Sequence, residues 1–158
     1  MRVVVFSDSH GGFDALCRVV EAQPRAEIFL HLGDGENETD DLRALYPQKR
    51  ILFVRGNCDP CSIAKDEDTI TVSGKRIFFT HGHAYSVKSG TAKLISRAAS
   101  QGADIACFGH THSPLSARVG QLYLVNPGSA DRPHLGQKPS YATIDIGPEG
   151  VAVNIIEF

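Results

Sequence analysis

Residues 2–34 read RVVVFSDSHGGFDALCRVVEAQPRAEIFLHLGD, and this stretch decides the fold. The β-branched run at 2–7 predicts a strand, and apolar residues recur at helical spacing within 13–22. A second apolar strand follows at 27–33. A strand, a helix and another strand in so few residues are typical of a parallel β-α-β unit with a right-handed crossover.

The pattern repeats once and then changes. A short helix at 38–46 and a third strand at 50–56 extend the parallel half. Beyond it we expect strands at 69–72 and 76–80 around a Ser73-Gly74-Lys75 turn, a helix at 91–102, a strand at 103–109, and two hairpins formed by 115–119 with 122–126 and by 141–146 with 151–158. These halves predict an α/β fold of two mixed sheets packed face to face, with helices outside, in a single domain at 1–158.

Composition and charge exclude several classes of protein. A chain of 158 residues with 42% apolar and 22% charged residues can bury its own core, without help from disulfides or a structural metal. The net charge is −2 and no block of Lys or Arg occurs, which argues against a nucleic-acid groove or an anionic membrane surface. No apolar run is long enough to span a membrane.

The four cysteines predict reduced thiols. Cys17 falls in a helical pattern and Cys107 in an apolar strand, so both are interpreted as core residues. Cys58 and Cys61 form a lone C-x-x-C, whereas a zinc ribbon needs a second pair. A redox dithiol is an alternative, although the motif does not open a helix as such dithiols usually do. The set is typical of a cytoplasmic protein.

Polar residues gather just past the ends of five expected strands. The clusters are Asp8-Ser9-His10, Gly33-Asp34, Gly56-Asn57, His81-Gly82-His83 and Gly109-His110-Thr111-His112. Ligands of open α/β sheets bind in the crevice outside the carboxyl ends of the strands. Asp8-x-His10 or Gly33-Asp34 alone fits a cap or a turn, whereas two imidazoles flanking one residue at a strand end, as in Gly109-His110-Thr111-His112, rarely serve packing. Five such clusters at successive strand ends predict one site.

The residue types in these clusters indicate metal chemistry. Two carboxylates, an asparagine carbonyl and up to five imidazoles exceed what one cation uses, and they suit two Mn²⁺, Fe²⁺, Ni²⁺ or Zn²⁺ ions better than Ca²⁺. Two such ions about 3.5–4 Å apart, bridged by a carboxylate and a hydroxide, can clamp a phosphoryl group and supply its nucleophile. His31, inside a strand, and His134, in a loop near Pro133, are interpreted as structural.

The motifs DSH, LGD, GNCD, THGH and GHTH, in this order, resemble those of the calcineurin-like metallophosphoesterases. The later NPGS at 126–129 resembles that of the small YfcE-like phosphodiesterase branch, found in bacteria and archaea. The resemblance covers nearly the whole chain. It implies a four-layer α/β/β/α sandwich and hydrolysis of phosphate esters with two divalent ions, with Mn²⁺ expected and Ni²⁺, Fe²⁺ or Zn²⁺ as other candidates.

The resemblance also implies a role for each motif residue. Asp8, His10 and His112 would hold the first ion, Asn57, His81 and His110 the second, and Asp34 would bridge them. Asn57, Cys58 and His83 are the candidate substrate contacts, and His83 could instead support the ligands from outside. Most of the wider superfamily has histidine at the position of Cys58, so transition-state stabilisation is expected to come mainly from the metals.

Three functions compete. The first is a phosphodiesterase that acts on a small phosphoester. The second is a non-catalytic metal-binding scaffold, because the retromer scaffold subunit resembles the same branch. The third, a thiol redox protein, leaves seven potential ligands unexplained. All seven positions keep residues that can coordinate a metal, which favours the enzyme. Exposed antiparallel edges such as 151–158 would suit a homodimer or a higher homo-oligomer.

Overall fold

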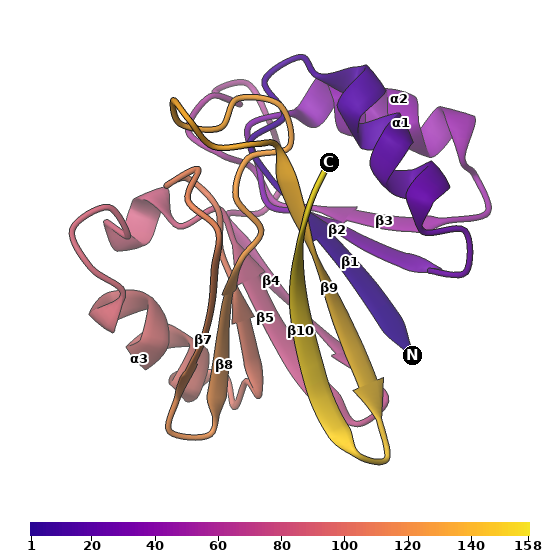
Figure 1. Ribbon diagram of the computed structural model, residues 1–158. Helices are drawn as coiled ribbons and strands as arrows, with labels where there is room; N and C mark the ends of the chain where they lie inside the picture. The colour runs from indigo at the N-terminus through magenta and orange to yellow at the C-terminus, as the bar shows by residue number, and fades with distance from the viewer.

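The computed structural model describes residues 1–158 and contains two five-stranded mixed sheets. The first sheet has the order β10-β9-β1-β2-β3 (Figure 1). Its parallel strands are β1 (Arg2–Phe6), β2 (Ile28–His31) and β3 (Arg50–Phe53), joined by α1 (Phe13–Ala22) and α2 (Glu36–Leu45). The antiparallel pair β9 (Ser140–Gly147) and β10 (Gly150–Glu157) extends it beyond β1. The β-α-β units expected from the sequence are confirmed.

The second sheet has the order β4-β5-β6-β8-β7. Its strands are β4 (Glu67–Val72), β5 (Lys75–Thr80), β6 (Ile105–Cys107), β7 (Leu115–Val119) and β8 (Leu122–Asn126). A single-turn 3₁₀ helix η1 (His83–Tyr85) and the helix α3 (Ala92–Ser100) lie between β5 and β6. β5, β6 and β8 run parallel to one another, while β4 and β7 are antiparallel edges.

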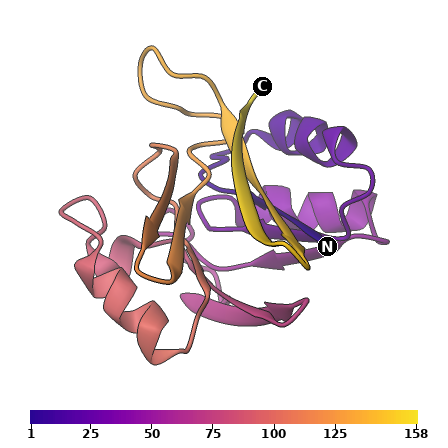
Figure 2. The same cartoon turned by 60° about the horizontal axis from the view of Figure 1, so that its bottom comes forward.

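The alternation of side chains along the strands produces four layers. In β2, Leu30 packs between the two sheets, while Phe29 belongs to the cluster under α1 and α2. In β5, Phe79 packs between the sheets and Phe78 under α3. Figures 1 and 2 show α1 and α2 on one side of the paired sheets and α3 on the other. The expected α/β/β/α sandwich is therefore confirmed.

The bounds of the elements differ from the expected ones by a few residues. α2 begins at Glu36 rather than at 38, because the distant Asp59 accepts hydrogen bonds from the first backbone N–H groups. The β4–β5 turn consists of Ser73 and Gly74, both at positive φ, as a two-residue hairpin with type I′ geometry requires. No helix is both long and apolar enough to cross a bilayer.

Candidate metal centre

The fold brings together all seven side chains that were expected to bind metal. Asp8 and His10 follow β1, Asp34 follows β2, Asn57 follows β3, His81 follows β5, and His110 and His112 follow β6. Three overlapping groups of potential ligands occur here, and within each group the ligand atoms lie within 4.8 Å of one another. Together these groups include residues that follow strands of both sheets. The candidate centre thus sits at the carboxyl ends of the parallel strands, as the sequence indicates.

The backbone at this centre is unusual. Of the seven non-glycine residues with positive φ, five are expected ligands, namely Asp8, His10, Asp34, His110 and His112, with φ between 43° and 66°. The left-handed region disfavours side chains with a Cβ, and such conformations cluster at functional sites where the surrounding structure enforces them. Most of the residues with this strained backbone are therefore ones selected from the sequence for their chemistry.

Asp8, His10 and His112 form the first group. Asp8 is fully buried, and its Oδ1 lies 3.2 Å from Nε2 of His112. Nε2 of His10 lies 3.3 Å from the same His112 nitrogen. His112 donates from Nδ1 to the backbone oxygen of Arg132 at 2.6 Å, so the lone pair of the neutral ring is on the Nε2 that faces the group.

Asn57, His81 and His110 form the second group. His81 is fully buried and donates from Nδ1 to the backbone oxygen of Leu32 at 2.8 Å. Its Nε2 lies 3.0 Å from Oδ1 of Asn57 and 3.1 Å from Nδ1 of His110. Burial lowers the pKa of His110 to about 4, which keeps its ring neutral. Three atoms that can ligate a metal therefore converge on one point.

Asp34 lies between the two groups. Its Oδ2 is 3.5 Å from Nε2 of His81 and 3.8 Å from Nε2 of His10. Its Oδ1 accepts the backbone N–H of Cys58 at 2.7 Å. The strand ends approach so closely here that a Cβ on Gly56 would collide with the Asp34 carboxylate. Glycine is therefore required beside this carboxylate.

The donor set fits divalent cations. Oδ1 of Asp8 is buried without a hydrogen-bond donor, although an unsatisfied buried carboxylate oxygen is costly. Burial would raise the pKa of Asp8, but the adjacent His112 and His81 side chains hold it below its ordinary value, so the group is ionised. The carbonyl oxygen of Asn57 and the Nε2 lone pair of His81 likewise face each other at 3.0 Å, which favours a cation or a proton between them.

Asp59 organises the loops that carry Asp34 and Asn57. Its carboxylate accepts the backbone N–H groups of Asp34 and Gly56 at 2.7 Å each, of Gly35 at 3.0 Å, and of Glu36 at 3.2 Å. One side chain thereby ties the end of β3 to the loop after β2 and caps α2. The carboxylate after Asn-Cys in the GNCD motif is the only sequence signal for this role.

The NPGS segment supports the remaining ligands. Asn126 donates from Nδ2 to the backbone oxygen of Gly109 at 3.1 Å, and Ser129 donates to the backbone oxygen of Asp8 at 2.8 Å. The histidine expected to be structural at 134 donates from Nε2 to the backbone oxygen of Thr111 at 2.7 Å. These hydrogen bonds hold the loop after β1, which carries Asp8, and the loop after β6, which carries His110 and His112.

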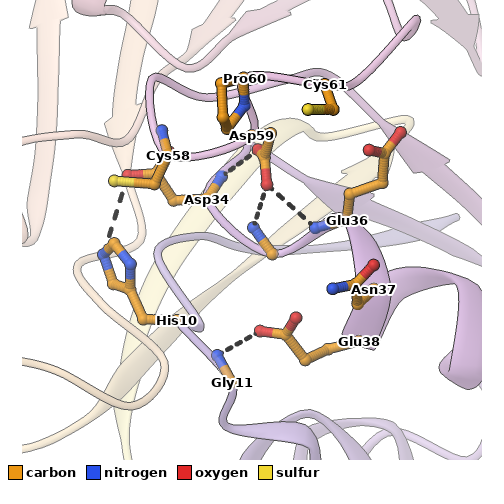
Figure 3. A pocket seen from close by; sticks show the side chains of 11 residues that line it. His10, Gly11, Asp34, Glu36, Asn37, Glu38, Cys58, Asp59, Pro60 and Cys61 are labelled. Atoms are coloured by element: carbon orange, nitrogen blue, oxygen red, sulfur yellow. Dashed lines mark hydrogen bonds and ion pairs between the residues drawn. The ribbon is translucent and has the colours of Figure 1, made fainter.

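The candidate substrate contacts border the same centre. Cys58 is exposed and lies within the same 4.8 Å grouping as His10 and Asp34, beside a cavity of about 360 Å³ (Figure 3). Burial and the Asp34 carboxylate raise the pKa of the Cys58 thiol. Cys61 is also exposed, and both thiols are free. The His83 ring centroid lies 5.3 Å from that of His81, and its buried Nδ1 has no hydrogen-bond partner.

Comparison with curated proteins identifies relatives over nearly the full chain. The probable metallophosphoesterase YsnB of Bacillus subtilis is 33% identical over 99% of this chain and 91% of its own. The phosphodiesterase YfcE of Escherichia coli K12 is 30% identical over 92% of this chain and 88% of its own. Both alignments cover most of each chain, so the likeness extends through all four layers.

Solved structures share the fold. A predicted phosphoesterase of Streptococcus pneumoniae TIGR4 superposes with a TM-score of 0.86 at 26% identity, over 99% of this chain and 88% of that one. Vps29 of Entamoeba histolytica, solved with Zn²⁺, has a TM-score of 0.76 at 23% identity over 99% of each chain, a likeness of fold alone. The protein-family model for the calcineurin-like phosphoesterase superfamily domain matches residues 1–149, and the chain therefore belongs to that superfamily.

Proposed function

We propose that this protein is a phosphodiesterase that works with two divalent metal ions. Asp8, His10 and His112 would hold the first ion and Asn57, His81 and His110 the second, with Asp34 shared between them. The observation that carries the proposal is the meeting of ionised or lone-pair-bearing atoms, with Nε2 of His81 3.0 Å from Oδ1 of Asn57 and Oδ1 of Asp8 3.2 Å from Nε2 of His112. Such atoms repel one another unless a cation or a proton lies between them.

The chain's own residues would orient the ligands and the substrate. When bound, a pair of divalent ions polarises phosphoryl oxygens and lowers the pKa of water, so that water can attack phosphorus near neutral pH. The backbone oxygens of Leu32 and Arg132 hold the His81 and His112 rings with Nε2 facing inward. Asn57 is neutral and leaves its ion more electrophilic than a second carboxylate would. Asn57, Cys58 and His83 are the proposed contacts to substrate.

Cys58 favours diesters over monoesters in this proposal. A positioned proton donor is worth about 10²–10⁴-fold when the leaving group is a poor one, and little when it departs as a stable anion. A thiol donates hydrogen bonds weakly and carries no positive charge toward a phosphate dianion, whereas an imidazolium would do both. The enzyme is therefore expected to act on diesters and activated esters.

Substitution of Cys58 tests this role. Cys58→Ala is expected to retain most activity toward an aryl phosphodiester, and Cys58→His to raise the ratio of monoesterase to diesterase activity. Steady-state kinetics with bis(p-nitrophenyl) phosphate and p-nitrophenyl phosphate measures both, with Cys61→Ala as the matched control. A Cys58→Ala protein that is folded and fully metallated but inactive would show that the thiol takes part in catalysis.

The proposed function is tested with a panel of phosphoesters and protein reconstituted with Mn²⁺. Aryl diesters should be hydrolysed faster than the corresponding monoesters, and the products should be one alcohol and one monoester. A protein that binds metal but hydrolyses nothing in the panel would instead support the scaffold alternative. The completeness of the seven-residue set favours the enzyme, since a scaffold that acts through its surfaces is free to lose such ligands.

A further inference from the structure

His31 is completely buried at the end of β2, yet it contacts two of the loops that carry candidate ligands. Its Nδ1 lies 3.1 Å from the backbone nitrogen of Gly33, and its Nε2 lies 3.0 Å from Oγ of Ser9. The ring packs between Phe6, edge-on at 5.1 Å between centroids, and Phe53 at 5.5 Å. The two aromatic neighbours leave the imidazole little freedom to rotate.

Each hydrogen bond of His31 has a defined direction. The backbone N–H of Gly33 donates to Nδ1, so the single N–H of the neutral ring is on Nε2 and donates to Ser9. Ser9 then donates its hydroxyl hydrogen to Oε1 of Glu38 at 3.0 Å, and that oxygen also accepts the backbone N–H of Gly11. Burial lowers the pKa of His31 to about 4, so the ring is neutral near pH 7.

This chain of bonds links the loop after β1 to the loop after β2. Ser9 lies between Asp8 and His10, while Gly33 precedes Asp34. Two backbone bonds also join these loops, from Asp8 N–H to the oxygen of Gly33 and from His10 N–H to the oxygen of Asp34, each at 3.0 Å. His31 therefore adds a side-chain link, through Ser9 and Glu38 of α2, to the direct bonds between the two backbones.

The atoms around the His31–Ser9 hydrogen bond are packed too closely for the distance between Ser9 and the backbone beside Asp34 to change freely. A Cβ on Gly35 would collide with Oγ of Ser9 and would lie 2.9 Å from Nε2 of His31. Gly35 directly follows Asp34, so the backbone that carries the shared carboxylate rests against the His31–Ser9 hydrogen bond. A change in that bond must move either Ser9 or the backbone beside Asp34.

We propose that His31 is a positioning residue, which acts through Ser9 and Glu38 to set the distance between Asp34 and the Asp8–His10 pair. The inference rests on the proposed function, because that distance would determine how the two ions share Asp34. Residues that hold metal ligands in place typically change metal affinity or activity by about 10–100-fold when replaced. A misplacement of about 1 Å at the reacting centre can cost about 10²-fold in rate.

The test uses substitutions that retain one of the two bonds. The amide of His31→Asn lies near the position of Nδ1 and can accept from Gly33, but it does not reach Ser9. The amide of His31→Gln lies near the position of Nε2 and can donate to Ser9, but it leaves the Gly33 N–H unpaired. Ser9→Ala removes the hydroxyl with little change in volume, and it keeps the test valid if a His31 variant does not fold.

Mn²⁺ alone serves as the probe. Calorimetry measures its affinity, and electron paramagnetic resonance measures the spin coupling of a Mn²⁺ pair. We expect His31→Asn and Ser9→Ala each to weaken Mn²⁺ binding about 10–100-fold and to alter the coupled spectrum. Because both variants break the same bond, the double variant should resemble either single variant. His31→Gln, which can retain the donor to Ser9, should recover part of the coupled signal.

Gln23→Leu is the control for loss of stability alone. Gln23 is buried, donates to the hydroxyl of Tyr141 at 2.9 Å, and accepts from Arg2, which begins β1 at the end away from the candidate centre. The Gln23→Leu substitution should lower the unfolding temperature of the protein and leave its Mn²⁺ spectrum unchanged. Unchanged affinity and spectrum in folded Ser9→Ala or His31→Asn would overturn the inference, as would a wild-type protein without a Mn²⁺ pair. A wild-type protein with the pair but no phosphodiesterase activity would overturn the proposed function alone.

Discussion

Asp34→Ala is expected to lower phosphodiester hydrolysis by orders of magnitude and to reduce the bound metal below two ions per chain. Oδ2 of Asp34 lies 3.5 Å from Nε2 of His81 and 3.8 Å from Nε2 of His10, so one carboxylate lies within reach of both groups of candidate ligands. Its removal takes away the negative charge that offsets two neighbouring cations. Kinetics with bis(p-nitrophenyl) phosphate and metal analysis of the same samples measure both effects.

Two further variants test whether the effect depends on the negative charge of Asp34 and on its position in the candidate centre. Asp34→Asn keeps an oxygen for the backbone N–H of Cys58 but lacks the charge, and it should lose nearly as much activity. Asp41→Ala removes an exposed carboxylate of α2 and should leave activity and metal content unchanged. An Asp34→Ala protein that still bound two ions tightly would contradict the assignment of Asp34 as the shared ligand.

Complete removal of metal is expected to abolish phosphodiester hydrolysis. Unactivated water attacks phosphorus slowly near neutral pH, and in the proposed function the bound ions supply its activation. Chelator-treated protein should regain activity with Mn²⁺ or Ni²⁺, and much less with Ca²⁺, which prefers a cage of oxygen ligands. Hydrolysis rates measured before stripping, after stripping and after each addition give the comparison.

Circular dichroism of the stripped protein provides the control for unfolding. The three buried apolar clusters do not include the candidate ligands, so the fold should persist without metal. Activity that survived complete stripping of folded protein would be incompatible with the proposed function. If the protein loses both its activity and its fold, the experiment is repeated at a lower chelator concentration, at which the structure is retained.

The arrangement of the sheets could be predicted because its signals are local. The β-branched run of β1 and the helical spacing of α1 specify a β-α-β unit by themselves, and the polar clusters follow each strand directly. Parallel strands place their carboxyl ends along one edge, so the convergence of Asp8, Asp34 and Asn57 follows from topology.

The bonds that support the site could not be predicted in the same way. Asp59 caps α2 from a position 23 residues beyond the helix start at Glu36, and Ser129 binds the backbone of Asp8 across 121 residues. Contacts between such distant residues leave no periodic pattern. The sequence indicated that His31 is structural, and the structure adds its bonds to Ser9 and Gly33.

Titration of stripped protein with Mn²⁺, with bound ions and hydrolysis of an aryl phosphodiester measured in the same samples, tests the central claim most directly. In the proposed function the two groups of candidate ligands share Asp34, so the rate should remain low until the second ion binds and should reach its plateau at two ions per chain. Full activity with one bound ion per chain, or with none, would contradict the account.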